Sequence, residues 1–263
     1  MLTISGLSVR GTSGFRRAGD GGASASGARV ILDEISLAVH AGECCAVIGP
    51  NGAGKSTFIK TIAGLIAPCA GAISFQGREV LSGGICSRSR CVAYLPQNTM
   101  PVPCSVFDAV LLGRRPCVNW RLGTRDRELT GAVLAELGLT HLASECVTRL
   151  SGGEFQKVLI ARALVQDAPV LLLDEPVNHL DIQNQVAILD MVRTQTVRRG
   201  MATMIVLHDL DFALRYADSV LLLHKGRSQY WGSAAQLPEE ALTATYGIPV
   251  TVREFDGRQR VLF

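Results

Sequence analysis

The sequence predicts an α/β fold with a mostly parallel sheet, into which a helical subdomain is inserted. The apolar run 44–48 is followed by a glycine-rich loop and then by an apolar stripe of helical period at 58–66, which predicts a strand, a tight loop and a helix. Residues 169–173 are wholly apolar, which is typical of a parallel strand covered on both faces. Between these segments, residues 97–165 show helical patterning and few strand signals.

The remaining elements follow from apolar periodicity and turn residues. Residues 2–9 and 30–39 alternate as strands do, and the Gly-, Ser- and Ala-rich segment 11–28 between them predicts a flexible insert. Ser105 is expected to cap a helix, and Asp256-Gly257 predicts a hairpin turn between the final strands. Further strands are expected at 72–75, 90–95, 202–207 and 220–223, and further helices at 124–137, 155–164, 182–198 and 238–246.

Composition narrows the class of protein. A chain of 263 residues with 48% hydrophobic residues suits one large domain with a substantial core, and a net charge of +3 does not indicate a nucleic-acid partner. None of the eight cysteines forms a C-x-x-C pair, so reduced thiols of a cytosolic protein are expected rather than a zinc site. No apolar run approaches the roughly 18 residues of a membrane span, and no signal peptide is indicated.

The glycine-rich loop matches the phosphate-loop pattern G-x-x-x-x-G-K-[ST] at every fixed position. Its glycines let successive N–H groups point inward as an anion nest, and the following helix adds the positive end of its dipole. Lys55 is expected to reach the terminal phosphates of ATP, and the Ser56 hydroxyl to bind Mg²⁺. A glycine-rich turn without a ligand is the alternative, which the strand–loop–helix context disfavours. The predicted loop comprises Gly49, Pro50, Asn51, Gly52, Ala53, Gly54, Lys55, Ser56 and Thr57.

Two carboxylates follow the apolar strand 169–173. Asp174 and Glu175 therefore lie at the carboxyl end of a strand, where α/β sheets place ligands. We expect Asp174 to hold Mg²⁺, directly or through water, and Glu175 to act as the base that polarises an attacking water. A solvated strand end is the alternative, and a phosphate loop in the same chain argues against it.

A second anion site is predicted at Leu150-Ser151-Gly152-Gly153-Glu154. Ser151 and two glycines stand at the start of a helix, where N–H groups and the helix dipole attract negative charge. Taken alone, an ordinary helix cap followed by glycines explains the segment equally well.

Together these motifs resemble the ATP-binding cassette (ABC) ATPases, over about residues 30–250. The resemblance implies a P-loop NTPase core made by residues 1–96 and 166–263, a helical signature subdomain at 97–165, and an antiparallel β subdomain. It also implies ATP hydrolysis between two copies of the chain that face each other head to tail.

The same resemblance implies roles for residues that are unremarkable by themselves. Gln97 corresponds to the glutamine that senses Mg²⁺ and water at the subdomain joint, and His208 to the histidine that contacts the γ-phosphate. Asp181 corresponds to an aspartate across the dimer interface. Ser151, Gly152 and Gly153 would touch the γ-phosphate bound by the partner copy.

Less specific segments resemble one branch of the family, the ATPases of metal-chelate importers for iron–siderophore complexes, haem and cobalamin. They are residues 107–114, 178–183 and 246–250. This likeness implies integral membrane permease subunits as partners, docked through residues 101–115, and indirectly a substrate-binding protein. The chain would then lie peripherally on the inner face of the cell membrane.

Two other functions stay open at this stage, namely the ATPase of an ABC exporter and a soluble ABC protein acting on DNA or ribosomes. A single cassette, the lack of a long coiled-coil insert and the small net charge argue against the second. The family usually places an aromatic residue after the first strand to stack on adenine. Here Val9 leads to Arg10, and Phe15 is the nearest aromatic residue, so Arg10 and Phe15 are the candidates.

Overall fold

The structure is a computed structural model of the whole chain, and it describes residues 1–263 except 12–28, 81–88, 118–120 and 256–257. The predicted insert at 11–28, apart from Gly11, lies outside the described residues. The same is true of Phe15 and of the predicted hairpin turn at Asp256-Gly257.

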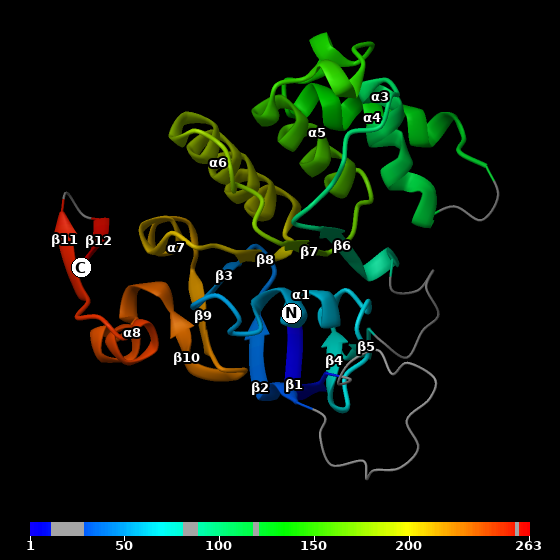
Figure 1. Cartoon of the computed structure of the whole chain (residues 1–263). Helices are drawn as coiled ribbons and strands as arrows, with labels where there is room; N and C mark the ends of the chain where they lie inside the picture. Colours follow the sequence, from blue (N-terminus) through cyan, green and yellow to red (C-terminus); the bar gives the residue numbers. More distant parts are fainter. Residues whose placement is uncertain (12–28, 81–88, 118–120, 256–257) are drawn as a thin grey trace, which may run out of the picture.

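A six-stranded sheet forms the centre of the molecule (Figure 1). In order across the sheet the strands are β10 (Arg227–Ser233), β9 (Ser219–His224), β3 (Cys44–Ile48), β8 (Ala202–Val206), β7 (Val170–Leu173) and β6 (Val92–Leu95). Only β10 runs antiparallel to its neighbour. The register pairs Ala46 with Ile205 and Leu172 with Met204.

Both faces of the parallel part of this sheet are covered, which explains why its strands are buried at nearly every position. Ala46 and Ile48 face the core under the helices, whereas Val47 faces the core shared with a second sheet. The expected strand at 90–95 begins only at Val92, because residues 89–91 are helical. The antiparallel edge strand β10 was not predicted, since its exposed, polar residues carry little apolar periodicity.

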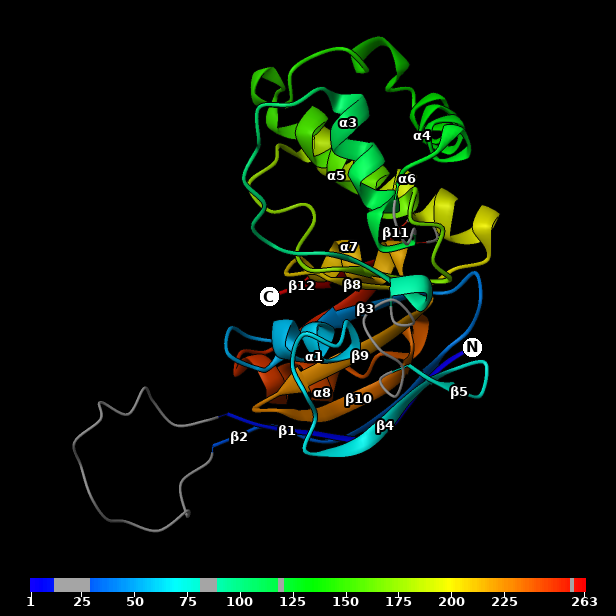
Figure 2. The ribbon, with the colours of Figure 1, turned by 90° about the vertical axis from the view of Figure 1, so that its right-hand side faces the viewer.

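The second sheet is antiparallel, as the resemblance implied, with the order β2-β1-β4-β5. It consists of β1 (Leu2–Arg10), β2 (Val30–Val39), β4 (Ala70–Phe75) and β5 (Arg78–Glu79). In β1 the buried residues alternate, so Ile4 lies between Leu37 and Ile73 in the ladder and its side chain enters the core. Figure 2 shows helix α1 (Lys55–Ile62) between this sheet and the central one.

A group of helices stands apart from the sheets, within the stretch that was predicted to be helical (Figure 1). It contains α3 (Val106–Leu111), η1 (Leu112–Cys117), α4 (Thr124–Glu136), η2 (Thr140–Leu142), η3 (Val147–Arg149) and α5 (Gly152–Leu164). Ser105 caps α3 as predicted, since its Oγ accepts the Asp108 N–H at 3.0 Å. The Arg114 Nε donates to Asp126 Oδ1 at 2.9 Å and so ties η1 to the first turn of α4.

The remaining elements are further helices and two strands that pair with each other in a separate antiparallel sheet. They are α6 (Ile182–Arg199), α7 (Leu210–Tyr216), η4 (Ala234–Gln236), α8 (Glu239–Tyr246), β11 (Thr251–Phe255) and β12 (Arg258–Leu262). Helix α7 was not predicted, because seven residues are too few for a clear helical period. Across the described stretches of the chain, no helix combines the length and the apolar character that crossing a bilayer requires.

Candidate functional site

The loop between β3 and α1 depends on glycines for both conformation and space. Gly49 has φ 141° and Gly54 has φ 105°, a region that L-residues rarely adopt. A Cβ on Gly49 would lie 2.1 Å from the Leu223 carbonyl oxygen, and one on Gly54 would lie 2.7 Å from the Leu32 Cδ2. The loop is therefore pressed against two neighbouring segments. A side chain at Gly49 would have to move the backbone of Leu223, and one at Gly54 would have to displace the Leu32 side chain and adopt a strained φ.

A cavity of about 640 Å³ opens beside this loop, within the range of small-molecule sites. One wall is the loop itself from Asn51 to Thr57, and Glu175 adds a carboxylate. The opposite walls are residues 29–31, at the start of β2, and the turn formed by Lys225 and Gly226.

Lys55 is the buried cation of the cavity, with 5% of its surface exposed. Its Nζ donates to the Gly49 and Pro50 carbonyl oxygens at 2.6 and 3.1 Å, so the ammonium group is held against the loop. Burial lowers the pKa of Lys55, whereas the nearby Glu175 and Asp174 charges raise it. The ammonium and the loop N–H groups together form a surface suited to phosphate oxygens.

Asp174 lies at the end of β7, fully buried, next to the helix that follows the loop. Ser56 Oγ donates to Asp174 Oδ1 at 3.0 Å, and the Tyr94 hydroxyl donates to Oδ2 at 3.4 Å. Burial raises the pKa of Asp174, and the hydrogen bond from Ser56 works in the opposite direction.

The pairing of Ser56 with Asp174 fits a magnesium ion, because Mg²⁺ prefers hard oxygen ligands. Among the residues that the structure describes, no three His, Cys, Asp or Glu side chains gather as metal ligands. Mg²⁺ does not need such a cluster, since one or two carboxylates with waters and substrate phosphates usually hold it.

Glu175 follows Asp174 and is the focus of three side chains from separate segments. Gln97 Nε2 donates to Glu175 Oε2 at 2.5 Å, and Asn178 Nδ2 donates to the same oxygen. His208 Nε2 lies 2.7 Å from Glu175 Oε1, and the Glu175 side chain is 8% exposed whereas that of His208 is 38% exposed. The structure thus brings Gln97, Glu175 and His208 together beside the cavity.

Two details of this cluster were missed. The amide nitrogen of Gln97 is engaged by Glu175, so only its amide oxygen stays available as a ligand. Asn178 was not proposed as a site residue, although its place three residues after Glu175 was a usable signal. Glu175 has φ 56°, and this positive φ marks a sharp turn after β7 through which Asn178 can reach back.

The second predicted anion site is a well-formed helix cap. Ser151 Oγ accepts the Glu154 N–H at 3.4 Å, and Glu154 Oε2 accepts the Ser151 N–H at 2.9 Å, which is a capping box. A Cβ on Gly153 would lie 2.4 Å from the Asn184 Oδ1, so α5 is pressed against the start of α6. There Asp181 caps α6 by accepting the Asn184 N–H at 2.8 Å.

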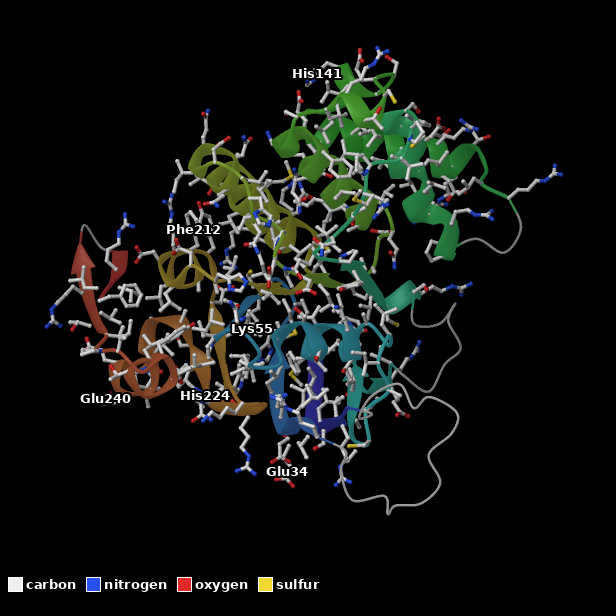
Figure 3. The ribbon with its side chains drawn as sticks, in the orientation of Figure 1. Glu34, Lys55, His141, Phe212, His224 and Glu240 are labelled. Atoms are coloured by element: carbon white, nitrogen blue, oxygen red, sulfur yellow. The ribbon has the colours of Figure 1, made fainter. Side chains whose placement is uncertain are left out.

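Ser151, Gly152 and Asp181 are exposed, and the described lining of the cavity includes none of them. Figure 3 shows His141 at the outer end of the helices and Lys55 at the centre of the molecule. Hydrogen bonds from Ser151 lower the pKa of Glu154, and the nearby charge of His141 contributes to this shift. Residues 151–154 therefore lie near His141 and do not line the cavity beside the phosphate loop of the same chain.

The candidates for adenine contact change with the structure. Arg10 is exposed at the end of β1 and does not line the cavity, and Phe15 lies outside the described residues. Val30 and Ile31 line the cavity instead, and Val30 is 48% exposed. Nothing in the sequence marked them, because they are ordinary apolar residues of a strand.

Comparisons with known proteins agree with this geometry. The family described as "ABC transporter" matches residues 32–178. An uncharacterised ABC transporter ATP-binding protein of Methanocaldococcus jannaschii is 38% identical over 238 residues, which cover 90% of this chain and 94% of that protein. A hemin import ATP-binding protein of Nocardia farcinica is 40% identical, covering 97% and 88% of the two chains. A cobalamin import ATP-binding protein of Halobacterium salinarum is 39% identical, covering 88% and 56%.

Solved structures give the same result. A metal-chelate type ABC transporter in an inward-facing conformation superimposes with a TM-score of 0.81 and 26% identity, covering 100% and 97% of the two chains. A dimeric ATP-binding cassette with bound ADP and phosphate superimposes with a TM-score of 0.74 at 22% identity, covering 89% and 99%, which supports the fold.

Proposed function

The chain belongs to the ABC transporter family, and we propose that it is the ATP-hydrolysing subunit of an importer for an iron–siderophore complex, haem, cobalamin or a related metal chelate. The ATPase chemistry is supported above all by one observation: Glu175 lies beside a phosphate-loop cavity, and Gln97 and His208 hold its two carboxylate oxygens. The cargo class is supported by the hemin and cobalamin import relatives.

The roles proposed for the site follow from its charges. Lys55 exchanges its bonds to loop carbonyls for bonds to phosphate oxygens of ATP, which are stronger because both partners are charged. Ser56 and Asp174 hold Mg²⁺, which supplies positive charge against the phosphates when bound. Glu175 accepts the proton of the attacking water, since its three present partners leave acceptor capacity on the carboxylate.

We further propose that the second copy of the chain completes the site head to tail. One phosphate loop covers one side of the nucleotide. The start of α5, where Ser151 and Gly152 are exposed and Gly153 is buried against Asn184, would meet the γ-phosphate bound by a partner. Asp181, exposed at the start of α6, would face the same interface. Family members dimerise, and the dimeric cassette structure is an example.

The permease subunits would dock beside α3, with a substrate-binding protein acting through them on the other side of the membrane. Met100 is 83% exposed and Val102 is 63% exposed, so apolar surface is open there. Arg114, which the family likeness placed on this surface, is instead a structural residue whose side chain is 14% exposed and paired with Asp126. Its guanidinium also bonds the Val165 carbonyl oxygen at 3.0 Å, so Arg115 is the arginine available for docking.

The experiment is ATP-driven uptake in vesicles that contain the permease subunits, with haem, cobalamin and a ferric siderophore as separate cargoes. The proposal predicts uptake of one of these cargoes and a loss of uptake, with ATPase activity retained, in Arg115→Glu. Arg127→Glu, on the exposed face of α4, is the matched control and should transport normally. Cargo expelled rather than taken up would favour an exporter, and copurification with nucleic acid instead of membrane proteins would favour a role on DNA or ribosomes.

A further inference from the structure

The side-chain amide of Gln166 holds the start of strand β6. Gln166 lies just after α5, and its Nε2 donates to the Val92 carbonyl oxygen at 2.8 Å and to the Ser89 carbonyl oxygen at 2.5 Å. In the described sheet β6 is an edge strand that pairs only with β7, so one side of its backbone has no strand partner. Gln166 therefore adds two hydrogen bonds at the start of a strand that the sheet supports from one side.

The other end of β6 reaches the carboxylates of the nucleotide site. The Leu95 carbonyl oxygen accepts the Asp174 N–H at 3.0 Å, and the Tyr94 hydroxyl donates to Asp174 Oδ2 at 3.4 Å. Gln97, two residues after the strand, donates to Glu175 Oε2 at 2.5 Å. The strand is only four residues long and contains no turn that could absorb a displacement. A shift at its start is therefore passed along the backbone to Gln97.

Arg114 in turn fixes the backbone of Gln166. Its Nη1 donates to the carbonyl oxygens of Val165 and Gln166 at 3.0 and 3.2 Å. These carbonyl groups follow the last turn of α5, where helix carbonyls need partners from outside the helix. A Cβ on Gly113 would lie 2.1 Å from the Arg162 carbonyl oxygen, so η1 is pressed against α5 at this point. Figure 1 shows β6 beneath the group of helices that contains α5.

We propose that Gln166 is a positioning residue for hydrolysis, which sets the place of Gln97 beside Glu175 by holding β6, while Arg114 holds Gln166. The inference rests on the proposed ATPase function and assigns a part in it to two residues outside the cavity. The described lining of the cavity includes neither Gln166 nor Arg114. Their effect is therefore on the chemical step and not on the binding of ATP.

The test compares phosphate release with ATP affinity, measured by calorimetric titration, in the full chain. Gln166→Met keeps the length of the side chain and removes its donors. The turnover number should fall about 10- to 100-fold, since a misplacement of about 1 Å can cost about 10²-fold. ATP affinity should stay within about twofold of wild type, because Lys55 and its loop are untouched. Gln195→Met is the matched control, since Gln195 is also buried and accepts the Arg199 Nε–H at 2.8 Å, away from β6. It should lower the melting temperature and leave the turnover number unchanged.

A double substitution separates positioning from general destabilisation. In a Gln97→Ala background, Gln166→Met should change the turnover number less than about twofold, because the group that it positions is already absent. Arg114→Lys is a milder variant that answers the question if Gln166→Met does not fold. Lysine keeps a positive charge beside Asp126 but cannot bond the carboxylate and both carbonyl groups at once. The turnover number should fall about 2- to 10-fold, again only when Gln97 is present.

A turnover number within twofold of wild type in both Gln166→Met and Arg114→Lys would overturn the inference and leave the proposed function intact. An equal loss with and without Gln97, or an equal loss in Gln195→Met, would also overturn it, because the effect would then not act through Gln97. A wild-type chain that hydrolyses no ATP would overturn the proposed function, and this inference with it.

Discussion

The two anion sites of the chain are built in opposite ways. At the phosphate loop, buried Lys55 and the Glu175 carboxylate line a cavity of about 640 Å³, and the fully buried Asp174 is bonded to Ser56 of the same lining. At the start of α5, Ser151 and Gly152 are exposed and line no described cavity, and the capping box satisfies the N–H groups of Ser151 and Glu154. In the proposed function, the first site would bind phosphate within one chain, whereas the second would act only with a partner copy.

This difference explains how one chain carries two sites for one ligand. Burial imposes a desolvation cost on the charged forms of Lys55 and Asp174, which neighbouring charges and hydrogen bonds offset in part and a bound, charged ligand would offset further. An exposed helix cap has no such desolvation cost and is stable without a bound ligand. In the proposed function, the phosphate loop would therefore supply most of the affinity for ATP, whereas Ser151 would contact the nucleotide of a second copy.

The largest expected effect is on hydrolysis. Glu175→Gln keeps the shape and the hydrogen bond to His208 but removes the base, so phosphate release should fall about 10²–10⁴-fold. Glu240→Gln, on the exposed side of α8, is the control and should hydrolyse ATP normally. A fall of less than about tenfold in Glu175→Gln would mean that another group acts as the base.

The next largest effect is on ATP affinity, compared between a substitution at each of the two sites. Lys55→Ala removes a charged donor and should weaken ATP binding roughly 10- to 150-fold, the range for hydrogen bonds to charged groups. Lys157→Ala, in α5 beside the second site, should leave the affinity of the isolated chain unchanged. If titration shows that ATP affinity falls equally in the two variants, the phosphate loop is not the main source of affinity in the isolated chain.

The smallest effect is on stability and its dependence on pH. Burial raises the pKa of Asp174 in the folded chain, so folding favours the protonated form. The stability that this gives is present below the ordinary aspartate pKa of about 3.9 and is lost as the pH rises through the folded value. At pH 7 the buried charge is therefore destabilising in the absence of Mg²⁺.

Asp174→Asn should accordingly melt about 2–4 °C above wild type at pH 7 without nucleotide, the shift that about 1 kcal/mol gives a chain of this size. The difference should vanish near pH 3–4 and reverse when ATP and Mg²⁺ are added, because the variant loses a metal ligand. Scanning calorimetry at the two pH values is the measurement. An Asp174→Asn variant less stable than wild type at pH 7 without nucleotide would contradict it.

Sequence patterns predicted the elements with strong periodicity or strong chemistry. The phosphate loop, Asp174 and the cap at Ser151 lie where their motifs placed them, because each motif is a local rule about backbone and charge. Short or polar elements such as α7 and β10 were not predicted, since their sequences carry little apolar periodicity.

The misses within the site are all contacts between segments that lie far apart in sequence or across a sharp turn. The salt bridge of Arg114 with Asp126, the Asn178 bond to Glu175 and the cavity wall at Val30 depend on how elements pack. Tertiary packing decides the contacts of Arg114 and Val30, which no local pattern in a single chain encodes, whereas the spacing of Asn178 from Glu175 was a usable local signal.

The measurement that tests the two-site account most directly is the mass of Glu175→Gln in solution by light scattering, with and without ATP and Mg²⁺. Because this variant should bind ATP without hydrolysing it, the account predicts dimers with ATP and monomers without. Adding Ser151→Arg should abolish the dimer by placing bulk and charge in the joint, whereas adding Ser144→Arg, also exposed among the helices, should preserve it. A Glu175→Gln chain that binds ATP yet stays monomeric, alone and with its permease subunits, would contradict the account.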